Sequence, residues 1–169
     1  MKISQTMQEA INLQIKHEYD NAFLYLSIAS WFEENDLPGF AKWNFVQYQE
    51  EQTHAVKFYN YLIERQGKVI VNSVDKPNSS WNSPIEVYQD ILVREQETTK
   101  AIYELCEKAQ NEKDFTSLSF LQWYLDEQVE EENNVSTILN KLKMVGDSKT
   151  GLMFLDGEMG KRTFNDETK

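Results

Sequence analysis

Residues 43–62, WNFVQYQEEQTHAVKFYNYL, decide the fold, because this run without proline or glycine carries one apolar face at helical spacing. The large side chains of that face are Trp43, Phe58 and Tyr61. Glu51 and His54 lie on the same face, three residues apart, so both side chains point the same way from a helix. A helix that buries this stripe therefore buries a carboxylate and an imidazole with it.

Three further stretches repeat the pattern, each with a glutamate in the middle of its stripe. Glu18 has apolar residues three and seven positions before it, and four and seven positions after it. Glu95 takes the same place in another stretch, and Gln128 and Glu131 take it in the last. The flanking residues are Ile11, Ile15, Ala22 and Tyr25, then Tyr88, Leu92, Thr99 and Ile102, and finally Leu121, Leu125, Val135, Ile138 and Leu142.

The apolar spacing predicts four long helices and a short fifth one. Their expected bounds are about 4–34, 39–66, 84–111, 114–145 and 150–158. The first two helices and the last two long ones are joined by short loops, which force each pair into an antiparallel hairpin. The long connection over residues 67–83 then crosses from one hairpin to the other. We expect a single all-α domain over residues 1–169: a four-helix bundle with one long crossover and a short C-terminal fifth helix.

Several helix ends have recognisable signals. Ser83 is placed to cap a helix that starts at Pro84, and Glu86 completes the pattern of a capping box. Gly67 and Gly146 are placed to end the helices before them. Residues 161–169 read as a polar end with no evident fold.

The formal net charge of −11 argues against a nucleic-acid partner, which requires a Lys- and Arg-rich surface. Acidity of this kind serves solubility, and it also suits a cationic partner such as a metal ion. Cys106 is the only cysteine, so neither an intrachain disulfide nor a thiolate cluster is expected. The N-terminus lacks the apolar run of a signal peptide, and no segment is long enough to span a membrane. We therefore expect a soluble cytoplasmic protein.

The glutamates at the centre of the stripes call for a compensating charge. Antiparallel pairing brings those of each hairpin to a similar height, so four helices deliver carboxylates to one layer. Burying ionised carboxylates costs several kcal/mol each, which either protonation or a multivalent metal relieves. A single Glu-x-x-His motif is usually a solvated helix face. Together with glutamates from the other helices, it is the ligand pattern of a di-iron bundle site. Oxygen ligands with one imidazole suit iron or manganese rather than structural zinc.

The sequence resembles the ferritin family, specifically the non-haem bacterial ferritins, over essentially its whole length. The matching strings are QIKHEYDNAFLY at 14–25, YQEEQTH at 48–54, REQ at 94–96, FLQWYLDEQVEEE at 120–132 and GLMFLDGE at 151–158. The resemblance implies one iron position held by Glu18, Glu51 and His54. It implies a second held by Glu51, Glu95 and Glu131, with Glu51 bridging the two.

The resemblance also implies roles beside these positions. Gln128 would orient a ligand or water, and Tyr25 would supply an electron or a hydrogen bond. The alternative for Tyr25 is core packing with a satisfied hydroxyl. A third, outer iron site would use Glu50, Glu127 and Glu130 together with the shared Glu131. The alternative is a solvated acidic face.

At two places this chain differs from related protein families, and these differences argue against membership of those families. Generic di-iron oxidases and bacterioferritins carry a second Glu-x-x-His on the fourth helix, where this chain has Gln128 and Glu131. Bacterioferritins bind haem through a methionine just after the bridging glutamate, where this chain has Gln52. No haem is therefore expected. The chain also lacks the cysteine pairs of a rubrerythrin.

The function implied by the resemblance is iron storage. Such a protein oxidises Fe(II) with dioxygen or hydrogen peroxide, and deposits ferric mineral inside a shell of 24 identical subunits. The sequence is also compatible with two other functions. One is a di-iron oxidase acting on an organic substrate, and the other is a non-catalytic shell or interaction protein with an incidental acidic interior. The buried set Glu18, Glu51, His54 and Glu95 argues against the last.

Overall fold

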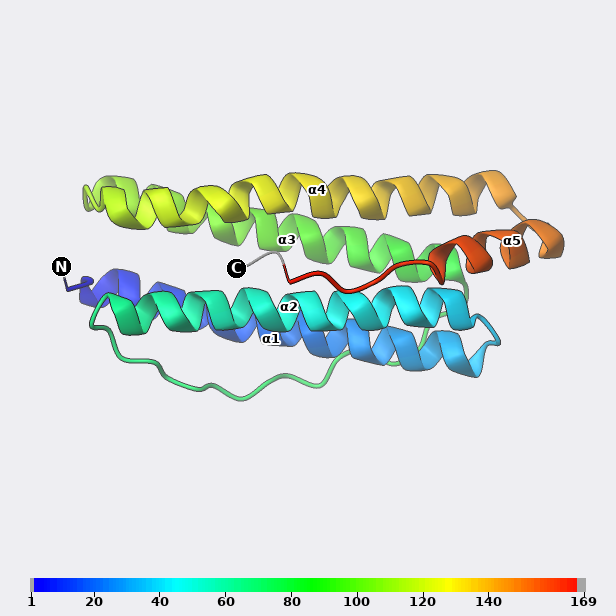
Figure 1. The fold of residues 1–169 in the computed structure, drawn as a ribbon, viewed down its shortest axis with the longest axis horizontal. Coiled ribbons are helices and arrows are strands. Elements are labelled where there is room, and N and C mark those ends of the chain that lie inside the picture. The colour runs from blue at the N-terminus through cyan, green and yellow to red at the C-terminus, as the bar shows by residue number, and fades with distance from the viewer. Residues whose placement is uncertain (1, 167–169) are drawn as a thin grey trace.

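Five α-helices make up the computed structural model, which describes residues 2–166 (Figure 1). They are α1 (Gln5–Glu34), α2 (Pro38–Glu64), α3 (Pro84–Asn111), α4 (Phe115–Val145) and α5 (Lys149–Met159). No strand occurs between residues 2 and 166. The predicted all-α four-helix bundle, with a long crossover and a short fifth helix, is confirmed.

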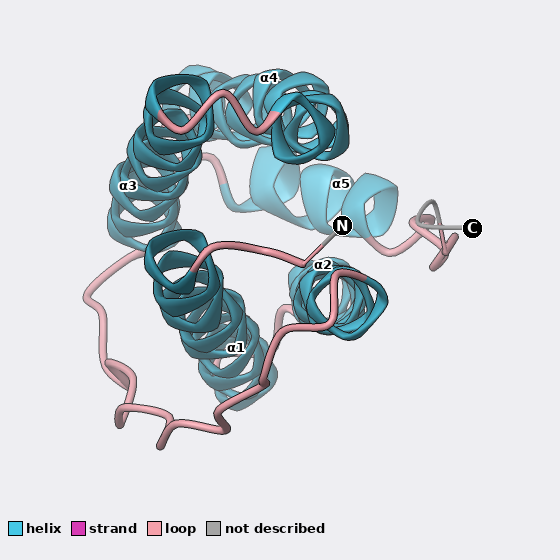
Figure 2. Ribbon diagram, turned by 90° about the vertical axis from the view of Figure 1, so that its left-hand side faces the viewer, coloured by secondary structure: helices cyan, strands magenta, loops and turns pink. Residues whose placement is uncertain are grey.

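The two hairpins, α1–α2 and α3–α4, lie side by side and form the bundle (Figure 2). The connection between them, residues 65–83, runs along the outside of the bundle beside α1 and α2 (Figure 1). Asn12 binds this connection from α1, because its side chain donates to the carbonyl of Lys68 at 2.9 Å and accepts from the amide of Ile70 at 2.7 Å. The crossover is thus tied to the helix that it passes.

Capping hydrogen bonds and the backbone conformation of single residues determine where helices α2 and α3 end and begin. Ser83 caps α3 by accepting a hydrogen bond from the amide of Glu86 at 3.2 Å. The return bond of the expected capping box is displaced by one residue, because the Glu86 carboxylate accepts from the amide of Asn82 instead. Helix α2 ends at Glu64, two residues before the expected bound, since Gln66 adopts a left-handed φ of 55°. The amide of Gly67 then bonds to the carbonyl of Leu62 at 2.8 Å.

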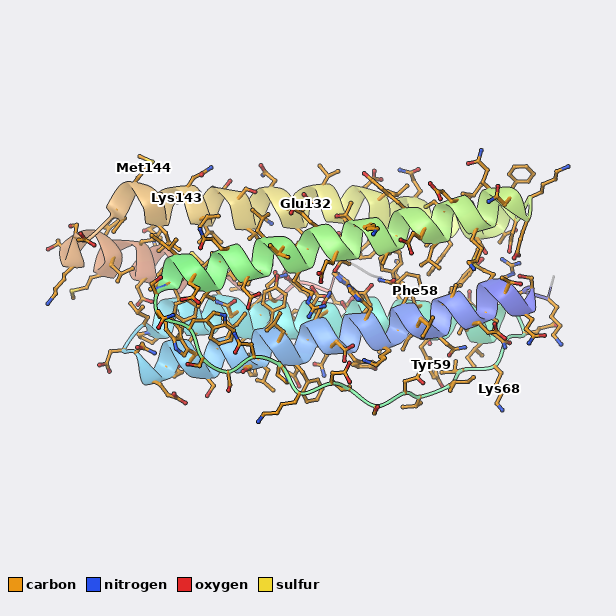
Figure 3. All side chains as sticks on the ribbon, turned by 180° about the vertical axis from the view of Figure 1, so that it is seen from behind. Phe58, Tyr59, Lys68, Glu132, Lys143 and Met144 are labelled. Carbon is orange, nitrogen blue, oxygen red and sulfur yellow. The ribbon has the colours of Figure 1, made fainter. Side chains whose placement is uncertain are left out.

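The apolar core is divided into two clusters, with a polar layer between them. One cluster fills the end of the bundle near the α1–α2 loop and includes Phe32, Phe40 and Tyr88. The other fills the opposite end and includes Ile11 and Phe58, which lies between the helices in Figure 3. On each long helix, the residues of the first cluster and those of the second lie on opposite sides of the central glutamates. Two packed ends therefore hold the four helices at fixed spacing around the polar layer.

Helix α5 packs against the bundle on the side of α2 and α4 (Figure 2). Its close approach depends on Gly39, where an added Cβ would lie 1.7 Å from the carbonyl oxygen of Asp156. The side chain of Asp156 also accepts a hydrogen bond from the amide of Phe40 at 2.9 Å, which satisfies one free donor at the start of α2. After α5 the chain turns back along the bundle between α2 and α4 (Figure 1).

An ion pair joins the hairpins at the end of the bundle remote from α5. Arg65 follows α2 and donates to Asp114, the N-cap of α4, with Nη2 and Oδ2 2.9 Å apart. Both side chains are largely buried.

Among residues 2–166, no helical stretch has the length and mean hydropathy that a bilayer crossing requires.

Candidate metal centre

Six polar side chains of the central layer come from the four long helices and are almost completely buried. The exposed fraction is between 0% and 5% for each of Glu18, Glu51, His54, Glu95, Gln128 and Glu131. Helix α1 supplies the first, α2 the next two, α3 the fourth and α4 the last two. Each glutamate lies between the two apolar clusters, which exclude water from it. The layer therefore has the low dielectric in which unpaired charges are costly.

Glu18, Glu51 and His54 come close enough to share a cation. One ligand atom from each lies within 4.8 Å of the other two. His54 Nδ1 and Glu51 Oε2 are 3.5 Å apart, and Oε2 is buried with no hydrogen-bond partner among residues 2–166. A buried carboxylate oxygen without a donor is unfavourable unless a proton or a cation neutralises the carboxylate. The donor set of oxygen atoms and one imidazole nitrogen fits iron.

His54 also faces a second group. Its Nε2 lies 3.8 Å from Oε1 of Glu127, and one ligand atom each of His54, Glu127 and Glu131 lie within 4.8 Å of one another. One nitrogen of the imidazole therefore faces Glu51 in the buried layer, and the other faces Glu127 on α4. Sharing of His54 between two clusters was not anticipated from the sequence, which placed it with Glu18 and Glu51 alone.

Both carboxylate oxygens of Glu95 accept hydrogen bonds from neighbouring side chains. The hydroxyl of Tyr25 donates to its Oε1 at 2.5 Å, and the amide of Gln128 donates to its Oε2 at 3.2 Å. The carboxylate oxygens of Glu51, Glu95 and Glu131 are farther apart. They do not all lie within 4.8 Å of one another, as the ligand atoms of Glu18, Glu51 and His54 do. The structure thus places Tyr25 and Gln128 as hydrogen-bond donors that orient Glu95.

Two glutamine side chains that the sequence analysis missed also hold carboxylates of the layer. Gln14 donates to Oε1 of Glu18 at 2.7 Å, and Gln47 donates to both oxygens of Glu131, at 3.1 and 3.0 Å. Both glutamines are at least 96% buried. A signal for them exists in the sequence, since Gln14 and Gln47 each precede a central glutamate by four residues and so share its helix face.

Burial and mutual repulsion shift the pKa values of these carboxyls upward. Desolvation, with the charge of Glu51 second, raises the pKa of Glu18 to about 8. Desolvation and the charge of Glu131 raise the pKa of Glu95 to about 8. The pKa of Glu51 is raised well above its usual value by desolvation and then by Glu95. Without a cation the layer therefore holds protons at neutral pH, and a metal ion would displace them.

The residues expected at an outer site line a pocket of about 430 Å³ between α2, α4 and the C-terminal segment. Glu50, Glu127, Glu130 and Glu131 all contribute to its wall, together with His54. Glu130 is exposed, whereas Glu50 and Glu127 are partly buried. Desolvation raises the pKa of Glu50 to about 7, although the nearby charge of Arg162 opposes the shift.

Arg162 is a third residue, after Gln14 and Gln47, that the sequence pattern did not single out. Residues 161–169 were expected to have no evident fold, but Arg162 forms an ion pair with Glu50 inside the pocket. Residues 167–169 lie outside the described part of the chain. No sequence signal identifies this contact, because the partners are more than one hundred residues apart and lie on different elements.

The fold and the central layer define a four-helix-bundle protein whose buried carboxylates and histidine form groups with the spacing of metal ligands. A family model described as a ferritin-like domain matches residues 8–145. The bacterial non-heme ferritin of Staphylococcus aureus is 38% identical over 165 residues, which are 98% of this chain and 99% of the relative. That of Staphylococcus haemolyticus is 36% identical over the same shares.

Solved structures agree with these relatives. A form of the Archaeoglobus fulgidus ferritin, engineered to be closed, has a TM-score of 0.96 and 44% identity, covering 97% of this chain and 100% of its own. The open-pore ferritin of the same archaeon has a TM-score of 0.95 and 45% identity, covering 96% and 100%. The chain belongs to the ferritin family, and the predicted likeness to non-haem bacterial ferritins is confirmed.

Proposed function

We propose that this protein stores iron by oxidising Fe(II) to Fe(III) at a two-iron ferroxidase centre within each subunit. Membership of the ferritin family supports the storage role. The observation that carries the ferroxidase centre is the buried, unpartnered Oε2 of Glu51, which lies beside His54 and in reach of Glu18. A protein with a merely structural interior has no reason to leave this oxygen without a donor.

Iron is the substrate of this centre, and the chain's own groups determine where it binds. Glu18, Glu51 and His54 hold one ferrous ion, and Glu51, Glu95 and Glu131 hold the other, with Glu51 shared. Binding displaces the protons that the raised pKa values keep on Glu18 and Glu95. Each Fe(II) loses one electron, and dioxygen or hydrogen peroxide accepts the pair.

The hydrogen bonds of the layer position the second set of ligands. Glu95 is oriented by Tyr25 and Gln128, and Glu131 is oriented by Gln47. These donors leave carboxylate lone pairs available, since each oxygen can accept from a donor and bind a cation at once. Outer groups of this kind usually set ligand direction and metal affinity.

A third iron position in the pocket beside α5 would receive ferric ions that leave the centre. Its ligands are Glu50, Glu127, Glu130 and Glu131. The closeness of Glu127 and Glu131 to His54 supports this route, because the two clusters adjoin through one imidazole. The acidic wall of the pocket also suits a cation better than an organic substrate, which argues against a di-iron oxidase.

Storage requires assembly, and we propose a shell of 24 subunits around the mineral. A pocket of about 430 Å³ is far too small for a mineral core. Large apolar side chains are exposed on the helices and on the connection between α2 and α3, and partner subunits would cover them. They include Leu13, Ile63, Val71, Met153 and Phe154, with exposed fractions between 53% and 87%.

The test adds Fe(II) aerobically to purified metal-free protein, and follows ferric absorbance and particle mass together. We expect fast oxidation by a large particle. Replacement of Glu51 by alanine should abolish fast oxidation and leave the particle intact. A monomer without oxidation would refute storage, and fast oxidation by a small particle would favour an oxidase. Fast oxidation by the Glu51→Ala variant would refute the assigned centre.

A further inference from the structure

The C-terminal segment, residues 160–166, reaches the outer pocket through one side chain. Arg162 Nη2 donates to Oε2 of Glu50, and the guanidinium lies 4.2 Å from the ring centroid of Trp43. The side chains of Arg162 and Glu50 are only 19% and 17% exposed. A cation is thus held in a largely desolvated place, between a carboxylate and an aromatic face.

That place belongs to the pocket proposed for the third iron. Its lining carries the acidic residues Glu50, Glu127, Glu130, Glu131 and Glu158. Its cationic residues are Arg162 and Lys141. Negative charge therefore exceeds positive charge in the pocket, and the ion pair with Arg162 neutralises one of the carboxylates expected to bind iron.

We propose that Arg162 is a displaceable counterion of the third metal position. It neutralises Glu50 while no metal is bound there, and an arriving cation takes its place and releases residues 161–166 from the pocket. This inference rests on the proposed function, because it assumes that Glu50 becomes a metal ligand.

The contacts of Arg162 are suited to exchange. Nη1 is buried and has no hydrogen-bond partner among residues 2–166, so the guanidinium binds Glu50 through one nitrogen instead of two. Paired N–H donors would hold the carboxylate more strongly, and a buried donor without a partner is unfavourable. Release of Arg162 would let both nitrogens reach water.

A metal ion at Glu50 would also make the present position of Arg162 unfavourable. A multivalent cation bound to the same carboxylate would place like charges within a few ångströms of each other, at side chains that are largely buried. The beginning of the segment has a separate attachment, since Nζ of Lys42 donates to the carbonyl of Gly160 at 2.9 Å. Displacement would therefore affect the residues after Gly160 and leave α5 in place.

The test titrates metal-free protein with Zn(II), which binds carboxylate and histidine ligands without redox chemistry. Calorimetry measures affinity for each equivalent per subunit, and hydrogen exchange with mass spectrometry measures protection of residues 161–166. The variant is Arg162→Gln. The matched control is Lys161→Gln, which removes the same charge from an exposed neighbour that pairs with Glu158.

We expect the first two equivalents to bind alike in all three proteins. The third should bind about tenfold more tightly to Arg162→Gln than to the wild type, because no counterion has to leave. In the wild type and in the Lys161→Gln control, exchange in residues 161–166 should rise as the third equivalent binds. In Arg162→Gln it should be high from the start.

A third equivalent that binds Arg162→Gln no more tightly than the wild type would overturn the inference. So would a wild type that takes only two equivalents, or a segment whose protection does not fall with zinc. If the Arg162→Gln variant fails to fold, the hydrogen-exchange measurement on the wild type still tests the inference by itself. Failure of the proposed function looks different, because the first two equivalents would then be missing.

Discussion

Gln47 on α2 donates its side-chain amide to both carboxylate oxygens of Glu131 on α4, at 3.1 and 3.0 Å. The contact joins helices of different hairpins in the middle of the bundle. It fixes the direction of the Glu131 side chain, which would otherwise have several rotamers, at the position where generic di-iron oxidases and bacterioferritins have a histidine.

Replacement of Gln47 by leucine should therefore slow iron oxidation on the order of tenfold, with the particle intact. The reason is loss of orientation at Glu131, which would lower occupancy of the proposed second iron position. Stopped-flow ferric absorbance at two Fe(II) per subunit measures the effect. Gln122→Leu, at an exposed position on α4, is the control and should behave as the wild type. An unchanged rate in Gln47→Leu would remove Glu131 from the centre.

Replacement of Tyr25 by phenylalanine distinguishes a role as hydrogen-bond donor to Glu95 from a role as electron donor. The hydroxyl of Tyr25 lowers the pKa of Glu95, which desolvation and Glu131 raise to about 8. Its loss should raise that pKa further, so that metal competes less well with protons. We expect oxidation to be slowed severalfold near pH 6.5 and much less near pH 8.5. An equal loss at every pH would instead indicate that Tyr25 supplies an electron.

The raised carboxyl pKa values make the metal-free protein sensitive to alkali. Glu18 and Glu95 titrate near pH 8 when folded, against a reference value of 4.5. Between these values the folded state binds more protons than the unfolded state, so the free energy of unfolding falls as pH rises. Calorimetry should therefore show a lower melting temperature at pH 8 than at pH 6.

Zinc should reverse part of that trend, because a metal ion replaces the protons. The increase in melting temperature that Zn(II) produces should be larger at pH 8 than at pH 6. Glu18→Gln, which cannot ionise, should weaken the pH dependence of the metal-free protein. A metal-free protein whose stability rises from pH 6 to pH 8 would contradict the account of the buried layer.

Asp114→Ala should destabilise the end of the bundle remote from α5. The substitution removes both the acceptor for Arg65 and the N-cap contact to the amide of Ser117 at 3.1 Å. We expect a loss on the order of 3 kcal/mol in the free energy of unfolding, measured with denaturant. Asp75→Ala breaks the more exposed pair with Lys16 and should cost less than about 1 kcal/mol.

Gly39→Ala should detach α5, because its Cβ would lie 1.7 Å from a backbone oxygen of that helix. A backbone contact cannot be relieved by a rotamer change, so α5 has to move. Hydrogen exchange should increase over residues 149–159 and change little in α1–α4. Gly157→Ala is the control, because a Cβ there meets no atom within 4 Å. Unchanged protection of α5 would contradict the docking geometry.

The sequence predicted those features that depend on residues close to one another along the chain. Periodic apolar residues predicted the helices, and buried positions within those stripes singled out Glu18, Glu51, His54 and Glu95. The same criterion applied to Gln14 and Gln47 would have found the amides that hold two of the carboxylates. The predicted end of α2 was two residues too late, since a single left-handed residue, Gln66, ended the helix before Gly67.

Helical spacing by itself determined the all-α bundle and brought a glutamate from each long helix to one buried layer. It did so because side chains three and four residues apart share a helix face, whatever lies opposite. Only the tertiary structure decided which groups meet across that layer and around it. Tyr25 with Glu95, His54 with Glu127, and Arg162 with Glu50 are contacts between different elements, and packing of those elements alone determines their distances.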